Sequence, residues 1–221
     1  MTTLSHDTSY SNDPREALET WYATSGVGQR LREQLVDDLS IALDELFGYH
    51  MVLLGTDPAI DIPSMTRVQQ VIRSRPGAGP VGTGALSVYA LDEELPFETE
   101  SVDVVVALHA LDVSEDPHQA LREIRRVLTP HGHLILVGMN PRSLLGGLRR
   151  LQSARSQSPW RGISPVSPHK AQDWLSLLDF NSDHARHKLV VPTSTRGRLR
   201  GVLQRLDERL VRHNVPLGSA T

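Results

Sequence analysis

Residues 95–138 constrain the fold of this chain more than any other stretch. Val102 to Leu108 is a nearly unbroken apolar run rich in β-branched residues, and Leu134 to Val137 repeats the pattern. Runs of this kind are typical of strands that are buried on both faces. We therefore expect two strands inside a covered sheet.

A helix is predicted between these two strands. Asp116 is a suitable N-cap, and Pro117 suits the first helical position. Apolar residues then fall on one helical face: Ala120, Leu121, Ile124, Val127 and Leu128. Residues 129–132, Thr-Pro-His-Gly, end the helix and turn the chain. A strand, a helix and a strand in so few residues predict a right-handed parallel crossover, the building unit of an α/β fold.

The same stretch carries many residues in a fixed order: Leu95, Pro96, Phe97, Asp103, Leu121, Arg122, Glu123, Arg126, Val127, Leu128, Pro130 and Gly132. That order resembles the second half of a class I S-adenosylmethionine-dependent methyltransferase domain. In that family a Leu-Pro-Phe segment precedes the fourth strand, and a proline-led helix leads to Pro-x-Gly and the fifth strand. The resemblance implies a doubly wound, mostly parallel, Rossmann-like sheet, with S-adenosylmethionine as the cofactor and methyl transfer as the activity.

Length and composition bound the organisation of the chain. It has 221 residues, a formal net charge of -3 and no cysteine, so cysteine nucleophiles, disulfides and cysteine metal clusters are excluded. The length suits one structural domain with appended helices. Within it we expect a helical lid over residues 1–47, a methyltransferase-like α/β domain over residues 48–192 with a basic insert at 140–172, and a C-terminal helix and tail over residues 193–221.

The first residues are polar and have neither the basic start nor the apolar centre of a signal peptide. No stretch reaches the apolar length that a membrane span requires. We therefore expect a cytoplasmic protein without membrane attachment.

Two helices are predicted ahead of the first strand. A cap at Asp13 starts the first, and apolar residues recur at helical spacing through the second, residues 27–47. In the resembled family such helices often help to close the substrate pocket. Trp21 and Tyr22 are candidates for that role, and ordinary packing is the alternative that the sequence favours.

The cofactor should lie beyond the carboxyl end of the first strand, which we predict at Met51 to Leu54. Members of the resembled family have an acidic residue followed by Gly-x-Gly-x-Gly there, whereas this chain has Leu-Leu-Gly-Thr-Asp-Pro. The resemblance implies cofactor contacts at Gly55, through close backbone approach, and at Asp57, through its polar side chain. A plain strand-to-loop turn is the alternative.

The second and third strands are predicted at residues 67–73 and 85–90. The family places an acidic residue at the end of the second strand for the ribose hydroxyls, but residues 73–75 are Arg-Ser-Arg. Since one charged hydrogen bond contributes about 1.5–3 kcal/mol, weak or lost cofactor binding is one expectation. Asp92 follows the third strand, offset by one residue from the family's adenine contact. It is a candidate for that contact or a solvated loop carboxylate.

His109 closes the fourth strand, where the resembled enzymes place residues that face the cofactor sulfur and the substrate. Because imidazole titrates near neutrality, His109 could orient the acceptor or act as a base; a polar residue that lines an empty cleft is the alternative. Asn140, after the fifth strand, is also expected to face the acceptor. The sequence assigns no catalytic residue. Paired histidines such as His131 and His133 do not predict a metal site.

The insert at residues 140–172 has six basic residues and no acidic one. It also contains Trp160, which could stack on a base, so an RNA acceptor is an alternative to a small molecule. A helix at residues 143–151 followed by a solvated loop is the plain alternative.

A sixth strand at residues 187–191 and a last helix at 196–212 complete the prediction. The family's seventh strand would be expected to begin near residues 216–221. Either that strand is missing, in which case an open sheet edge could pair with a protein partner or with a second copy, or the chain is a shortened form. A second hypothesis follows from Gly55, the only glycine of its motif, from Arg73 and Arg75 where an acid is expected, and from the expected lack of the seventh strand. It is a non-catalytic methyltransferase-like module that binds a protein or RNA partner.

Overall fold

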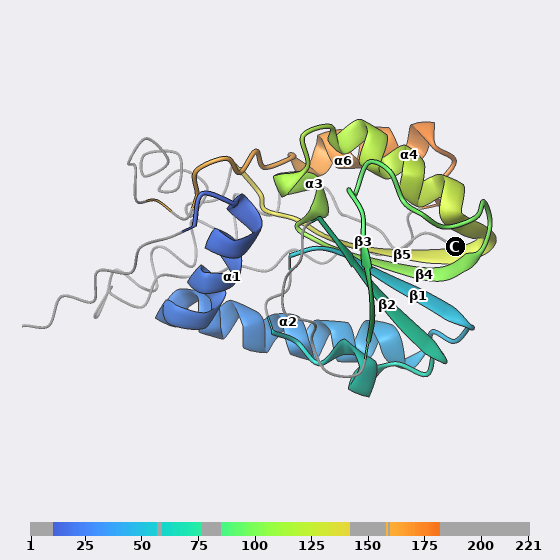
Figure 1. Cartoon of the computed structure of the whole chain (residues 1–221), viewed down its shortest axis with the longest axis horizontal. Coiled ribbons are helices and arrows are strands. Elements are labelled where there is room, and N and C mark those ends of the chain that lie inside the picture. The colour runs from blue at the N-terminus through green and yellow to red at the C-terminus, as the bar shows by residue number, and fades with distance from the viewer. Residues whose placement is uncertain (1–10, 57–58, 77–84, 142–157, 159, 182–221) are drawn as a thin grey trace, which may run out of the picture.

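Five parallel strands form one sheet in the order β3-β2-β1-β4-β5, with helices on both of its faces (Figure 1). The structure is a computed structural model that describes residues 11–56, 59–76, 85–141, 158 and 160–181. The predicted doubly wound parallel sheet is confirmed.

The strands are β1 (His50–Gly55), β2 (Gln70–Arg75), β3 (Leu86–Tyr89), β4 (Val102–Leu108) and β5 (Leu128–Val137). β1 is central and pairs with β2 on one side and β4 on the other. The chain therefore winds outward from β1 in both directions. In open α/β sheets the ligand binds beyond the carboxyl ends of the strands at such a reversal.

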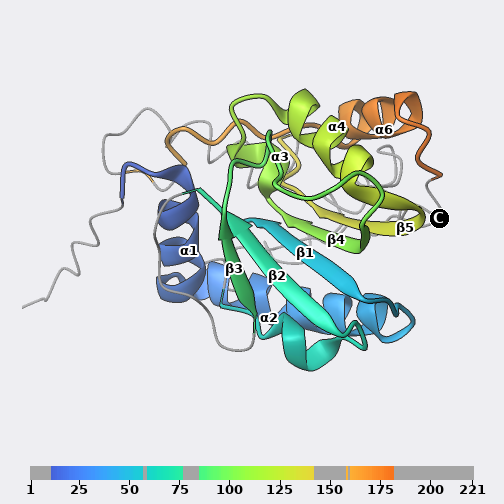
Figure 2. The ribbon, with the colours of Figure 1, turned by 45° about the vertical axis from the view of Figure 1, so that its right-hand side comes forward.

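The helices cover two faces and one end of this sheet (Figures 1 and 2). They are α1 (Pro14–Thr24), α2 (Gly26–Asp44), the 3-10 helix η1 (Ile62–Met65), α3 (Ala110–Val113), α4 (Pro117–Val127) and α6 (Pro168–Leu177). α2 covers one face together with η1, and α4 and α6 cover the other. α1 stands at the end of the sheet where the strands reach their carboxyl ends.

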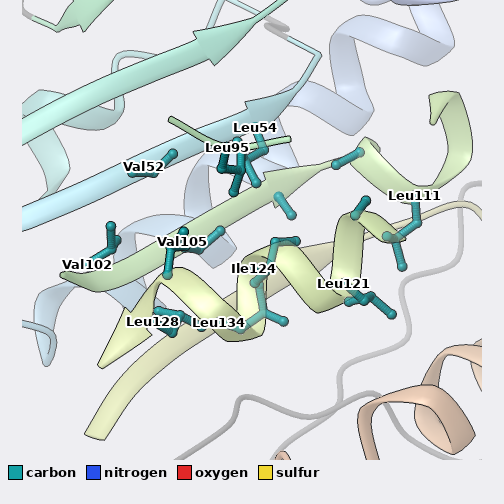
Figure 3. Close-up of a cluster of buried hydrophobic side chains, with 14 of the residues drawn as sticks. Val52, Leu54, Leu95, Val102, Val105, Leu111, Leu121, Ile124, Leu128 and Leu134 are labelled. Carbon is teal, nitrogen blue, oxygen red and sulfur yellow. The ribbon is translucent and has the colours of Figure 1, made fainter. Parts of the chain in front are cut away.

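The predicted crossover helix α4 forms because its N-cap residue and its apolar face both favour a helix over the same residues. The Asp116 side chain accepts hydrogen bonds from the backbone N–H groups of His118 and Gln119, at 3.1 and 3.0 Å. Leu121 and Ile124 belong to one buried cluster with Val105 and Leu134, and Figure 3 shows these side chains between the helix and the strands. Burial of each such side chain contributes roughly 1.5–3 kcal/mol.

Several residues that carry the family resemblance hold the fold together. Arg126 donates from Nη1 to the Phe97 carbonyl oxygen and from Nη2 to the Leu95 carbonyl oxygen, both at 2.8 Å. Glu123 accepts the Leu95 N–H at 3.0 Å and pairs with Arg126 at 2.7 Å. The Leu-Pro-Phe segment is thereby fixed to α4, which explains why the motif predicts the fold and says little about chemistry.

Some predicted boundaries differ from the observed ones. The second strand is two to three residues later than predicted, because its last residue, Arg75, is held in register by Tyr89 of β3. The fifth strand begins earlier, at Leu128, which pairs with Val102 ahead of a register shift. The predicted helices at 143–151 and 196–212 and the strand at 187–191 lie outside the described residues.

Candidate functional site

α1 lies across the carboxyl ends of the strands (Figure 2). Asp13 caps the helix by accepting the Arg15 backbone N–H at 2.8 Å, and Pro14 occupies its first position. Three polar side chains on one face of α1 each contact a residue at the end of a different strand. The pairs are Arg15 with Asp92 after β3, Glu19 with Arg75 of β2, and Tyr22 with His109 after β4.

Tyr22, His109 and Asp112 form a chain of buried polar contacts. Tyr22 Oη is 2.7 Å from His109 Nε2, and His109 Nδ1 is 2.9 Å from Asp112 Oδ2. His109 has a left-handed backbone, with φ of 56°, where the chain turns from β4 into α3. That turn places Asp112 one helical turn away and directs the imidazole toward α1.

The hydrogen-bond partners of Asp112 indicate which nitrogen of His109 carries a hydrogen. Asp112 Oδ2 also accepts the Met139 N–H at 2.8 Å, and Oδ1 accepts the Val166 N–H at 3.3 Å. A carboxylate surrounded by donors acts as an acceptor, so His109 Nδ1 carries a hydrogen and donates it to Asp112. In the neutral ring Nε2 is then an acceptor and receives the Tyr22 hydroxyl. Nε2 is the atom of this group that could take up a proton from a substrate.

An aromatic cluster holds α1 in this position. Trp21 and Tyr22 pack with Met139 and Trp160, and the ring centroids of Trp21 and Trp160 are 4.8 Å apart. Trp160 is only 5% exposed. The suggestion that Trp160 stacks on an RNA base is therefore wrong, because its ring is already buried against α1. Tyr22 both packs in this cluster and contacts His109, so its packing is confirmed and a role in closing the substrate pocket stays a prediction.

Asp92 is fully buried at the carboxyl edge of the sheet and pairs through Oδ2 with Arg15 Nη2 at 3.0 Å. Burial raises the pKa of Asp92 above its usual value, although the Arg15 guanidinium and the nearby Gly55 backbone N–H oppose the rise. The alternative of a solvated loop carboxylate is therefore wrong. An adenine contact for Asp92 stays a prediction.

Gly55 is required by the packing of two strand ends. Its φ is +86°, and an added Cβ would lie 2.2 Å from the Leu108 carbonyl oxygen and 2.7 Å from the Ala110 nitrogen. The next residue, Thr56, donates from its backbone N–H and its hydroxyl to the same Leu108 oxygen, at 2.8 and 3.2 Å. Close approach therefore occurs between β1 and the turn after β4. A cofactor contact at Gly55 stays a prediction, and Asp57 lies outside the described residues.

Buried side-chain atoms on α1 and near the carboxyl ends of β2 and β3 include four that have no hydrogen-bond partner within the described part of the chain. They are Arg15 Nε, Ser74 Oγ, Arg75 Nε and Asp92 Oδ1. Buried polar atoms are normally hydrogen-bonded, by protein, water or a ligand. The ends of β2 and β3 beneath α1 thus form a polar environment that suits a ligand with several donors and acceptors.

The structure brings His109 and Asp92 to the same edge of the sheet and joins each to α1. Asn140 is partly buried and follows Met139, whose N–H contacts Asp112, so it lies close to the His109 end of this edge. Sequence reasoning missed Arg15, Glu19 and Asp112 as site residues. For Asp112 a signal existed, because it is an acidic residue within an apolar run and follows His109 by three positions.

No group of three or more histidine, cysteine or acidic side chains within the described ranges is arranged to hold a metal ion. In the same part of the chain, the structure shows no helix with the length and apolar character of a membrane span.

Comparison with known proteins identifies the family. Residues 65–136 match the model of the methyltransferase domain family. The chain is 33% identical over 171 residues to the uncharacterised protein YafS of Escherichia coli strain K12, covering 77% of this chain and 68% of that protein.

Solved structures show the same fold. The YcgJ protein of Bacillus subtilis is similar with a TM-score of 0.59 at 15% identity, covering 83% of this chain and 85% of that one. An S-adenosylmethionine-dependent methyltransferase of Thermotoga maritima, described as a possible histamine N-methyltransferase, is similar with a TM-score of 0.53 at 18% identity, covering 77% of this chain and 86% of that one. The sequence relative, the domain match and the sheet order together place this chain in the class I S-adenosylmethionine-dependent methyltransferase family.

Proposed function

We propose that this protein is a cytoplasmic enzyme that transfers the methyl group of S-adenosylmethionine to a nucleophile on a small molecule or an RNA. The reaction would take place at the carboxyl edge of the sheet, beneath α1. The observation that carries this proposal is Asp92, a fully buried carboxyl group beside the end of β1. Its Oδ1 has no hydrogen bond of ordinary length among the described residues, although the Gly55 backbone N–H lies near enough to lower its pKa. A group of this kind favours a polar ligand that can donate to it.

The side chains at this edge fit the adenosine part of the cofactor. Asp92 can accept hydrogen bonds from an amino or a hydroxyl group, and Ser74 can both donate and accept. S-adenosylmethionine supplies an already activated methyl group when bound, so the contribution of the protein is mainly to hold donor and acceptor in line. Gly55, Asp57 and Asp92 are the proposed cofactor contacts.

His109 is the proposed proton acceptor for the nucleophile. Asp112 holds Nδ1 as a donor and leaves Nε2 to accept, so Nε2 can take the proton that the nucleophile loses on methylation. In the observed state Nε2 receives the Tyr22 hydroxyl at 2.7 Å. Tyr22 must therefore give way before an acceptor can reach Nε2. Asn140, beside this group, would contact the acceptor.

A small-molecule acceptor is favoured over RNA by the described part of the basic insert. Trp160 is buried, while Arg161 and Lys170 are exposed. Among the described residues of the insert, two exposed cations and no available aromatic ring offer little to stacked bases and a phosphate backbone.

The second candidate is a non-catalytic methyltransferase-like module that binds a protein or an RNA. It is favoured by the end of β1, where Gly55 packs against the turn after β4 and Thr56 bonds twice to Leu108. In this arrangement the backbone at the end of β1 is turned toward the protein rather than toward a ligand. The predicted pairing of an open sheet edge depends on residues outside the described ranges.

Calorimetric titration of the full chain with S-adenosylmethionine and S-adenosylhomocysteine distinguishes the two candidates. Under the enzyme proposal both bind, and Asp92→Asn weakens binding about ten-fold or more through loss of a charged acceptor. Asp173→Asn, on the exposed side of α6, is the control and should leave binding unchanged. Absence of binding at millimolar ligand would overturn the enzyme proposal and favour the module.

A further inference from the structure

The carboxyl end of β2 has the wrong charge for a nucleoside site. Its last residues are Arg73, Ser74 and Arg75, and Pro76 follows. In doubly wound sheets that bind adenosine cofactors, a carboxylate at this position accepts hydrogen bonds from the ribose hydroxyls. A guanidinium has donors and no acceptor, so Arg75 cannot take that role.

A carboxylate nevertheless reaches this place from another element. Glu19 of α1 has Oε1 at 3.7 Å from Arg75 Nη2, and the two side chains are 21% and 13% exposed. The separation is that of an ion pair and is longer than a normal N–H to O hydrogen bond. An ionised carboxylate offers about four acceptor sites, so it can receive two hydroxyl groups while it keeps contacts to protein groups.

Contacts of two other residues of α1, one before Glu19 and one after it, fix the position of Glu19. Arg15, one turn before it, pairs with Asp92, and Tyr22, one turn after it, contacts His109. The helix is therefore held in register over the strand ends, with Glu19 in the middle. Ser74 Oγ and Arg75 Nε, at the carboxyl end of β2, are buried and have no hydrogen-bond partner in the part of the chain that the structure describes.

We propose that Glu19 of α1 supplies the carboxylate that binds the ribose hydroxyls of S-adenosylmethionine, in place of the acid that β2 lacks. This inference rests on the proposed function. Arg75 acts as a positioning residue that draws the Glu19 carboxylate to the end of β2. The cofactor site is then completed by the N-terminal helix, and the absence of an acid in β2 does not imply loss of binding.

The test is calorimetric titration of the full chain with S-adenosylhomocysteine and with its 2′-deoxy analogue. In the wild type, loss of the 2′-hydroxyl should weaken binding about ten-fold or more, because it removes a hydrogen bond to a charged group. In Glu19→Gln, S-adenosylhomocysteine should bind about ten-fold more weakly, and the difference between the two ligands should shrink. Glu16→Gln, an exposed position on the same helix, is the matched control and should behave as the wild type.

The outcomes separate the two proposals. Wild-type binding of S-adenosylhomocysteine with an unchanged Glu19→Gln variant would overturn the role of Glu19 and leave the proposed function standing. Equal wild-type affinity for the 2′-deoxy analogue would also overturn it, and that measurement does not depend on a variant that folds. Absence of any wild-type binding would overturn the proposed function itself, and the role of Glu19 with it.

Discussion

At the scale of single residues, Asp112 joins three separate parts of the protein. Its carboxylate accepts from His109, from the Met139 N–H after β5 and from the Val166 N–H before α6. Hydrogen bonds to a buried charged group contribute more than neutral ones, and a donor left without its acceptor loses its solvation as well.

We expect Asp112→Asn to lower the free energy of unfolding by about 1.5–3 kcal/mol, because an amide cannot accept from all three donors. Urea unfolding followed by circular dichroism measures the change. Asp173→Asn is the matched control, since Asp173 contacts His169 at the same 2.9 Å distance but is 61% exposed. The control should change stability by less than about 0.5 kcal/mol. Equal effects of the two variants would contradict the role assigned to Asp112.

Asp92 gives a prediction about pH. Burial raises its pKa, Arg15 and the Gly55 N–H oppose the rise, and Glu93 adds to it. A carboxyl group with a higher pKa in the folded than in the unfolded chain stabilises the fold fully below its unfolded pKa of about 3.9. That contribution is lost as the pH rises through the folded pKa.

We therefore expect the stability of the wild type, measured relative to Asp92→Asn, to fall as the pH is raised from about 4 toward neutrality. Urea unfolding of both proteins across this range tests the sign. The opposite slope, with the wild type gaining on the variant as the pH rises, would mean that the Arg15 ion pair outweighs burial.

At the scale of elements, the contact between α1 and α2 decides whether α1 can reach the strand ends. A Cβ added to Gly28, in the first turn of α2, would lie 2.4 Å from the Trp21 carbonyl oxygen and 2.9 Å from the Tyr22 Cα. For Gly26, two residues earlier, the nearest atom outside its chain neighbours and its own helix backbone is Arg30 Nη2, the end of a side chain, at 4.0 Å from the added Cβ.

We expect Gly28→Ala to destabilise the protein by about 1–3 kcal/mol and to speed hydrogen exchange of the α1 amides, because the added methyl group separates the helices. Gly26→Ala should be neutral or stabilising by up to about 1 kcal/mol, since alanine favours the helix. Urea unfolding and hydrogen–deuterium exchange measure both effects. A stabilised Gly28→Ala protein with unchanged exchange in α1 would show that the contact is not tight.

The elements also show where sequence reasoning succeeds. α4, β1 and β4 lie where they were predicted. The apolar residues of each follow the pattern of a single kind of element, helix or buried strand, and α4 also has a local start signal in the Asp116 cap. β2 was misplaced by two to three residues, because pairing with β1 and β3 sets its ends. Its local sequence contains no signal for that register.

At the scale of the whole molecule, the enzyme proposal predicts that binding of the cofactor raises the free energy of unfolding. A ligand that binds only the folded chain stabilises it by about 2.7 kcal/mol at one hundred times its dissociation constant, which is roughly 5–10 °C for a domain of this size. We expect S-adenosylhomocysteine to raise the melting temperature accordingly, as measured by scanning calorimetry. ATP, an adenine nucleotide with a different tail, is the control and should have little effect. The same small shift with both ligands would favour the non-catalytic module.

The sequence by itself determined the kinds of elements and their parallel arrangement, because burial on both faces of a strand and on one face of a helix leaves a periodic pattern in the chain. The family was indicated separately, by the resemblance of the ordered residues between Leu95 and Gly132. The sequence also marked the strand ends at which Gly55, Asp92 and His109 lie. These features depend on short stretches of sequence.

Only the tertiary structure decided what those residues meet. Tyr22 and His109 are 87 positions apart, and Arg15 and Asp92 are 77 apart, so no local pattern links them. The fold brings them together because α1 crosses the edge where parallel strands end, and burial then requires each polar group to find a partner. The same crossing puts Glu19 at the end of β2, so the acid missing from one element is present in the structure on another.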